Sequence, residues 1–90
     1  EQIKLENGRL FKVDYFTEEQ IFISGRIQDF YGVNKHPEIL NRKLLIKLLA
    51  PNRRPAQLTT DISGFWSGSY VEIRKELKRR YPKHDWPEKP

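Results

Sequence analysis

The chain has 90 residues, of which 37% are hydrophobic and 12% aromatic, so it is long enough for one compact domain with a small core. It contains no cysteine, which excludes disulfides and thiolate metal sites. No apolar run approaches the roughly 20 residues of a membrane span, and the first residues lack the basic-then-apolar order of a signal peptide. We therefore expect a cytoplasmic protein without a membrane partner. Because the sequence starts at Glu1 and not at a methionine, we also expect a segment of a longer chain.

Seventeen lysines and arginines against twelve acidic residues give a net charge of +5. Such an excess favours polyanionic partners, most often nucleic acid. Many unrelated small domains share it, so charge alone indicates a partner class only weakly.

The first predicted element is a β-hairpin. Asn7-Gly8, the strongest short turn signal, lies between the strand-like segments 3–5 and 10–15. In the second segment apolar residues alternate with polar ones, which predicts one buried face.

A helix is predicted next. Thr17 and Gln20 have the spacing of a capping box, with Glu18 and Glu19 in the first turn, where the helix dipole favours them. Apolar residues follow at helical spacing, and a glycine suited to the left-handed C-terminal position comes after them. These residues are Ile23, Ile27, Phe30 and Gly32. Gly25 would lie inside this helix, where glycine lowers stability by about 1 kcal/mol relative to alanine. A glycine at such a position is usual only where another element packs closely against it.

The second half alternates strands and helices. We expect a polar connection over 33–42, a buried strand over 43–50, a turn over 52–55 and a short returning strand over 56–59. Thr60 or Asp61 can cap a brief helix through Trp66, and a second capping box over 69–72 opens the last helix. On that helix four apolar residues fall within roughly an 80° arc and predict its core stripe: Tyr70, Ile73, Leu77 and Tyr81. The predicted fold is a single α+β domain over residues 1–90, in the order β-β-α-β-β-α-α.

Residues 51–87 read PNRRPAQLTTDISGFWSGSYVEIRKELKRRYPKHDWP. This stretch resembles, without gaps, the carboxy-terminal signature of HrpB-type helicases, which are bacterial members of the DEAH-box group. The matching positions are Arg54-Pro55, Gln57, Thr59, Asp61, Phe65-Trp66, Gly68-Ser69-Tyr70, Arg74-Lys75-Glu76, Arg80 to His84 and Trp86-Pro87. Residues 10–50 resemble the family more loosely. The resemblance implies an accessory domain whose partner is the rest of a helicase, and a parent that hydrolyses ATP with magnesium and moves along or unwinds RNA or DNA.

The sequence itself contains no phosphate-binding loop of the form G-x-x-x-x-G-K-[ST] and no Asp-Glu-x-His run. His36 and His84 have no cysteine to join them in a metal site, and the adjacent Glu18 and Glu19 would point in different directions. We therefore predict no catalytic, metal-binding or cofactor-binding residue here. ATP and magnesium are expected in the parent motor only.

The last helix carries the candidate binding surface, because four cations project from one flank of its core stripe, and neighbouring loops add three more. The candidate nucleic-acid-binding residues are Arg53, Arg54, Arg74, Lys75, Lys78, Arg79 and Lys83. We expect weak, sequence-indifferent binding of single-stranded nucleic acid, with RNA favoured over DNA. Replacing Lys75 and Arg79 should then weaken this binding more than replacing Lys4 and Lys12.

Three other interpretations remain open for this surface. It can be a solvated helix face with Glu72–Lys75 and Glu76–Arg80 pairs. The domain can also be a protein-interaction module that recruits the helicase to a partner, or a purely structural cap.

Aromatic residues could stack on bases, but in so small a domain Tyr70 and Tyr81 are expected in the core. Trp86 lies in a tail with three prolines, which lower the entropy lost on ordering. We expect this tail to fold back and Trp86 to pack on the body of the domain, near the amino-terminal hairpin.

Overall fold

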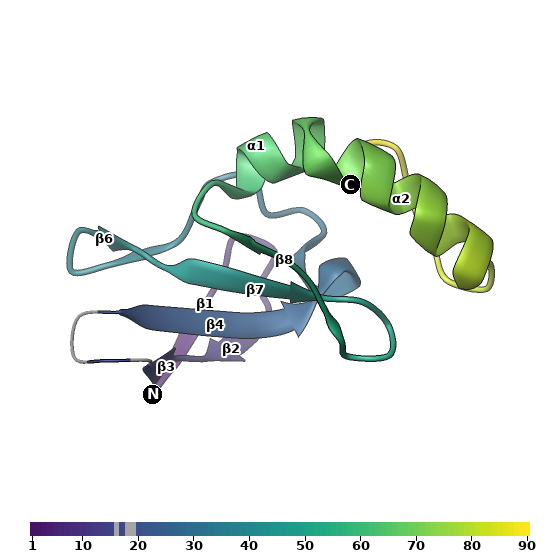
Figure 1. Ribbon diagram of the computed structural model, residues 1–90. Helices are drawn as coiled ribbons and strands as arrows, with labels where there is room; N and C mark the ends of the chain where they lie inside the picture. Colours follow the sequence, from purple (N-terminus) through teal and green to yellow (C-terminus); the bar gives the residue numbers. More distant parts are fainter. Residues whose placement is uncertain (16, 18–19) are drawn as a thin grey trace.

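The structure, a computed structural model, describes residues 1–15, 17 and 20–90. Within these ranges the chain forms eight short strands, one 3-10 helix and two α-helices (Figure 1). The strands form one four-stranded sheet and two separate hairpins. The predicted α+β class is confirmed.

The amino-terminal hairpin pairs β1 (Gln2–Lys4) with β2 (Leu10–Lys12) in antiparallel register. Gly8 adopts a φ of +85° in the turn, a conformation that glycine permits. The Asn7 side chain donates hydrogen bonds to the carbonyls of Asp29 (3.0 Å) and Tyr31 (2.9 Å). The predicted hairpin is therefore confirmed, and its turn is tied to a distant segment.

The central sheet has the order β3-β4-β7-β8. Its strands are β3 (Asp14–Tyr15), β4 (Ile21–Arg26), β7 (Leu45–Leu49) and β8 (Pro55–Thr59). The central pair β4 and β7 is parallel, with Ile23 opposite Ile46, and the outer pairs are antiparallel. The buried strand expected over 43–50 and its return over 56–59 are both confirmed.

The helix predicted from residue 17 is wrong, because residues 21–26 form strand β4. Ile21 and Ile23 are buried in alternation, and β-branched isoleucine favours an extended backbone. Only Ile27–Phe30 turns, as the 3-10 helix η1. Gln20 N–H does donate to Thr17 Oγ1 (3.1 Å), but Gln20 directly precedes strand β4 and does not lie in a helix. Glu18 and Glu19 lie outside the described residues.

The expectation that Gly25 marks close packing is confirmed, in a strand instead of a helix. A Cβ at this position would lie 2.9 Å from the Phe11 ring and 3.0 Å from the Phe30 ring. These two rings stack with centroids 4.6 Å apart. Gly25 thus lets hairpin β1–β2 and η1 meet over β4.

The connection expected over 33–42 contains a hairpin that the sequence analysis missed, β5 (Glu38–Ile39) paired with β6 (Arg42–Lys43). Its two turn residues, Leu40 and Asn41, have φ of 52° and 64°, as in a type I′ turn. Leucine is unusual there, so no local pattern indicated the turn. In Figure 1 this hairpin projects from the body, and Leu40 at its tip is 90% exposed.

Two helices follow the sheet and run along the side where β8 lies (Figure 1). Helix α1 (Ile62–Ser67) is capped by Asp61, whose carboxylate accepts from Gly64 N–H at 3.0 Å, as predicted. Helix α2 (Ser69–Arg80) begins differently, because its N-cap is Gly68 and no side chain caps it. The second capping box is therefore wrong. Ser69 Oγ instead accepts a hydrogen bond from the Gln57 side chain (3.1 Å).

One hydrophobic cluster joins the sheet, the hairpin β1–β2, the helices and the tail. The predicted α2 stripe is confirmed, with Tyr70 and Leu77 buried and Ile73 and Tyr81 packed against the cluster. Its buried residues are Leu5, Phe11, Val13, Ile21, Ile23, Ile27, Phe30, Val33, Leu44, Ile46, Leu48, Ile62, Phe65, Trp66, Tyr70, Leu77 and Trp86.

Candidate nucleic-acid interface

Helix α2 presents three exposed cations of the predicted set, Lys75, Lys78 and Arg79. Lys75 Nζ lies 3.6 Å from the Glu72 carboxylate, so that predicted pair is present. Glu76 pairs with Arg79 and not with Arg80 as predicted, one position earlier on the helix. Both pairs are solvent-exposed and contribute little to stability, so the charges remain accessible to a polyanion.

Arg74 differs from its neighbours because it is half-buried. Its Nε donates a hydrogen bond of 2.6 Å to the carbonyl oxygen of Trp86. A guanidinium fixed on a backbone carbonyl holds the tail against the helix. Arg74 therefore has a structural role, and its contact with nucleic acid stays a prediction.

The carboxy-terminal tail is held by bonds to three successive carbonyls. Tyr31 OH donates to Asp85 (2.7 Å), Arg74 to Trp86, and Tyr70 OH to Pro87 (2.6 Å). Burial raises the pKa of the Tyr31 phenol and of the Tyr70 phenol, so both stay protonated donors. The tail is thus hydrogen-bonded both to α2 and to Tyr31, which follows η1.

Trp86 is 4% exposed, and its Nε1 donates to the carbonyl of Tyr81 at 2.9 Å. The prediction that the tail folds back and buries this indole is confirmed. Its expected place near the amino-terminal hairpin is wrong, because these bonds join the tail to α2 and to Tyr31, which follows η1. The indole is committed to the core and is not presented to a base.

Arg53 and Arg54 lie in the turn between β7 and β8, where both side chains are exposed. Arg53 adopts a φ of +67°, and its N–H donates to the carbonyl of Ala50 (2.8 Å). The structure brings Arg53 together with Arg9 and Lys12 of the amino-terminal hairpin around one cleft of about 340 Å³. Arg9 and Lys12 were missed, because no local pattern indicates that residues so distant in the chain meet.

Lys83 lies in the loop after α2 and is exposed. The next residue, His84, shares a hydrogen bond of 3.3 Å between its Nδ1 and the Gln28 side chain. The predicted cations therefore fall into two groups, one on α2 and the loop after it and one at the β7–β8 turn.

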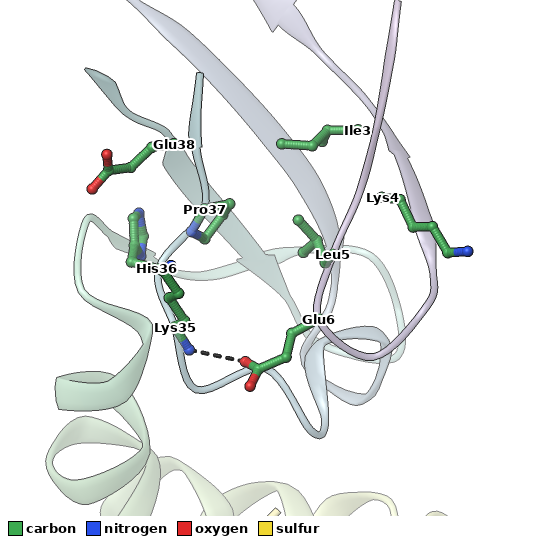
Figure 2. Close-up of a pocket in the computed structure, with 8 residues that line it drawn as sticks. All are labelled: Ile3, Lys4, Leu5, Glu6, Lys35, His36, Pro37 and Glu38. Atoms are coloured by element: carbon green, nitrogen blue, oxygen red, sulfur yellow. Dashed lines mark hydrogen bonds between the residues drawn. The ribbon is translucent and has the colours of Figure 1, made fainter. Parts of the chain in front are cut away.

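A larger cleft, of about 580 Å³, lies between β1 and residues 35–38 (Figure 2). Figure 2 shows Ile3 and Leu5 on one wall and Pro37 on the facing segment. The Glu6 carboxylate at its rim accepts backbone N–H bonds from Lys35 (3.0 Å) and Asn34 (2.7 Å). These bonds, the one from Lys35 above all, hold the pKa of Glu6 below its usual value. The carboxylate is thereby an intramolecular anchor for this loop.

His36 also lines this cleft, but both of its ring nitrogens are engaged. Nδ1 accepts from the N–H of Ile62 (3.0 Å), and Nε2 lies 2.6 Å from the carbonyl of Leu44. These partners define the neutral tautomer with the proton on Nε2. His36 is a structural bridge.

The part of the chain that the structure describes contains no cluster of three or more His, Cys, Asp or Glu residues able to hold a metal ion. None of its described helices has both the length and the apolar character needed to cross a membrane.

The fold defines a small α+β domain closed by a helix pair and a docked tail. A protein-family model described as "ATP-dependent helicase C-terminal" matches residues 1–90. The chain therefore belongs to this family, HrpB_C, as the resemblance of residues 51–87 implied.

Similar proteins agree with this assignment. The chain is 39% identical over 85 residues to a protein named "ATP-dependent RNA helicase HrpB" from Escherichia coli strain K12, covering 92% of this chain and 10% of that protein. The crystal structure of the E. coli DExH-box NTPase HrpB superposes with a TM-score of 0.89 at 36% identity, over 99% of this chain and 11% of that one. A crystal structure of the E. coli DEAH/RHA helicase HrpB superposes with a TM-score of 0.61 at 34% identity, over 94% of this chain and 11% of that one. The chain thus spans about a tenth of these relatives.

Proposed function

We propose that this chain is the non-catalytic carboxy-terminal domain of an ATP-dependent RNA helicase, packed on the rest of that helicase. In this proposal it offers a basic surface to single-stranded nucleic acid, RNA in preference to DNA. The observation that carries the proposal is the group of accessible cations on α2 and the loop after it. We call Lys75, Lys78, Arg79 and Lys83 the helix patch.

The helix patch suits a phosphate backbone better than a base. Each lysine or arginine that neutralises a phosphate releases condensed counterions, which favours binding and makes it salt-dependent. The ion pairs of Lys75 and Arg79 are exposed and exchange readily with solvent or phosphate. Arg74 supports the surface indirectly, by fixing the tail beneath it.

ATP and magnesium belong to the parent motor in this proposal. The sequence has no phosphate-binding loop, and Glu6, one of the two acids that line the cleft of about 580 Å³, accepts the backbone N–H groups of Asn34 and Lys35. The residues present therefore do not fit a nucleotide site. Purified chain incubated with ATP and magnesium should release no phosphate above background, and measurable turnover would contradict a non-catalytic role.

The nucleic-acid role is tested by binding of a labelled oligouridylate across a salt series. Replacing Lys75 and Arg79 by glutamine should weaken binding at low salt and flatten the slope of log K against log salt by about 0.7 per lost contact. Glutamine is preferred to glutamate, because reversal would place like charges beside Glu72 and Glu76. Lys4 and Lys43, both exposed and away from α2, are the matched control. Lys12 is a poor control because it lines the cleft with Arg53.

Equal losses from the two double variants would mean that bulk charge, and not the helix patch, drives binding. Failure of the unaltered chain to bind oligouridylate at low salt would reject the nucleic-acid role. That result would favour the protein-interaction module that recruits the helicase to a partner.

A further inference from the structure

The cleft between β2, the end of β4 and the β7–β8 turn collects cations from separate parts of the chain. Arg9 and Lys12 come from the amino-terminal hairpin and Arg53 from the turn between β7 and β8. We call these three residues, together with Ser24 of β4, which also lines it, the cationic cleft. Its volume of about 340 Å³ is at the lower end of the range for small-ligand sites, about 300–1,000 Å³.

The charge balance of the cationic cleft is positive. Asp29 is the carboxylate that lines it, and it is shared between Arg9 (3.6 Å) and Arg26 (3.7 Å). Lys12 lies 3.8 Å from Asp14, which is outside the cleft. Among the residues that the structure describes, Arg53 forms no ion pair. Three cations therefore face one shared carboxylate, and the arginine and lysine heads stay accessible, since the side chains of Arg9 and Lys12 are 61% and 77% exposed.

The backbone at Arg53 points to the same conclusion. A φ of +67° lies in the left-handed region, which glycine or asparagine adopts with less strain than arginine. Arg54, the next residue, is also exposed but does not line the cleft. An arginine in this strained position gains no ion pair within the described part of the domain, so its charge is available to an external anion.

We propose that the cationic cleft binds a phosphodiester group of single-stranded RNA, as a second contact separate from the helix patch. This inference rests on the proposed nucleic-acid role of the domain and adds a site on different elements. Arg9, Lys12 and Arg53 neutralise the charge of the phosphate.

The cationic cleft contacts the phosphate backbone of the RNA and not its bases. Phe11 is the aromatic ring among its lining residues, and it is 7% exposed and stacked on Phe30. A ring buried in this way offers no face for base stacking, and phosphate contacts carry no sequence information directly. Binding at this site is therefore indifferent to sequence.

The test compares Arg53→Gln with Lys43→Gln, two neutralisations at exposed positions, of which the first lines the cleft and the second lies on β6 outside it. Both chains are titrated with a fluorescein-labelled oligouridylate of about ten nucleotides, enough to span a typical single-strand site. Arg53→Gln should weaken binding at low salt roughly threefold or more and reduce the salt slope by about 0.7. Lys43→Gln should leave the slope unchanged. Lys12→Gln, at an exposed strand position, should act like Arg53→Gln and guards against a folding defect at the turn.

Amide NMR spectra of the chain separate this inference from the proposed function. Oligouridylate should shift the signals of Ser24, Gly25 and Arg53 as well as those of α2. Shifts confined to α2, or equal effects of Arg53→Gln and Lys43→Gln, would overturn the cationic cleft and leave the helix patch standing. No binding by the unaltered chain would overturn both. Inorganic pyrophosphate should compete only weakly, and displacement of the oligonucleotide by equimolar pyrophosphate would reassign the cleft to free phosphates.

Discussion

His36 joins two segments that are far apart in the sequence. Its Nδ1 accepts the N–H of Ile62, one of the first-turn donors of α1 that has no partner inside the helix, and its Nε2 bonds the carbonyl of Leu44. Replacement by alanine leaves both half-buried groups without this partner. We expect His36→Ala to lower the free energy of unfolding by about 1–3 kcal/mol, measured by urea denaturation.

The second histidine is the matched control for this prediction. His84 is exposed, its ring makes one hydrogen bond, to Gln28 at 3.3 Å, and its ring centroid lies 6.1 Å from that of Tyr81 and 6.2 Å from that of Trp86. His84→Ala should therefore change stability by less than about 0.5 kcal/mol. Similar losses for the two variants would contradict the assignment of His36 as a bridge.

Arg74 illustrates what residue-level reasoning from the sequence could and could not predict. Its place on one flank of the core stripe followed correctly from helical periodicity. Its hydrogen bond to the Trp86 carbonyl depends on the position of the tail, and helical periodicity gives no information about that position. The role of a surface cation is thus decided by tertiary partners that become visible only in the folded chain.

The starts of the two helices allow a comparison at the level of the element. Asp61 caps α1 through Gly64 N–H, whereas Ser69, which was predicted to cap the last helix, lies inside α2 and accepts a hydrogen bond from Gln57. We expect Asp61→Ala to destabilise the domain by about 1 kcal/mol and Ser69→Ala by a few tenths, in thermal unfolding of both variants. A larger loss of stability from Ser69→Ala than from Asp61→Ala would support the capping box that was predicted over 69–72.

Strand β4 shows why an element of the wrong type was predicted. Ile23, Ile27 and Phe30 fit helical spacing, but Ile23 belongs to a strand and the other two to a 3-10 helix. Apolar positions of two consecutive elements can imitate the period of one helix. The strands over 43–50 and 56–59 were predicted correctly because Pro51 and the turn after it delimit them clearly.

At the scale of the whole molecule, the parallel pairing of β4 with β7 decides which residues meet. It brings Ser24 and Gly25 beside the end of β7, so that the turn carrying Arg53 reaches the hairpin carrying Arg9 and Lys12. The α+β class followed from apolar periodicity, caps and turn signals. The parallel pairing did not, because local periodicity does not determine the order of strands in a sheet. The cationic cleft was therefore beyond prediction from the sequence.

The carboxy-terminal tail connects distant parts of the fold. Trp86 is 4% exposed, and the carbonyls of Asp85, Trp86 and Pro87 accept bonds from Tyr31, Arg74 and Tyr70. In a Trp66→Phe background, which leaves Trp86 as the sole indole, we expect blue-shifted emission that acrylamide quenches poorly.

Removing the indole in that background should then destabilise the whole domain. Trp86→Ala loses the buried area of the ring and leaves a cavity against α2, and we expect a loss of about 3 kcal/mol or more in urea denaturation. The partly buried bonds made by Arg74 and Tyr70 should weaken with it, because the carbonyls they hold are kept in place by the docked ring. Glu88→Ala, an exposed position on the same tail, is the control and should leave stability unchanged within about 0.5 kcal/mol. Emission like that of free tryptophan, with no loss of stability in Trp86→Ala, would mean that the tail is not docked in solution.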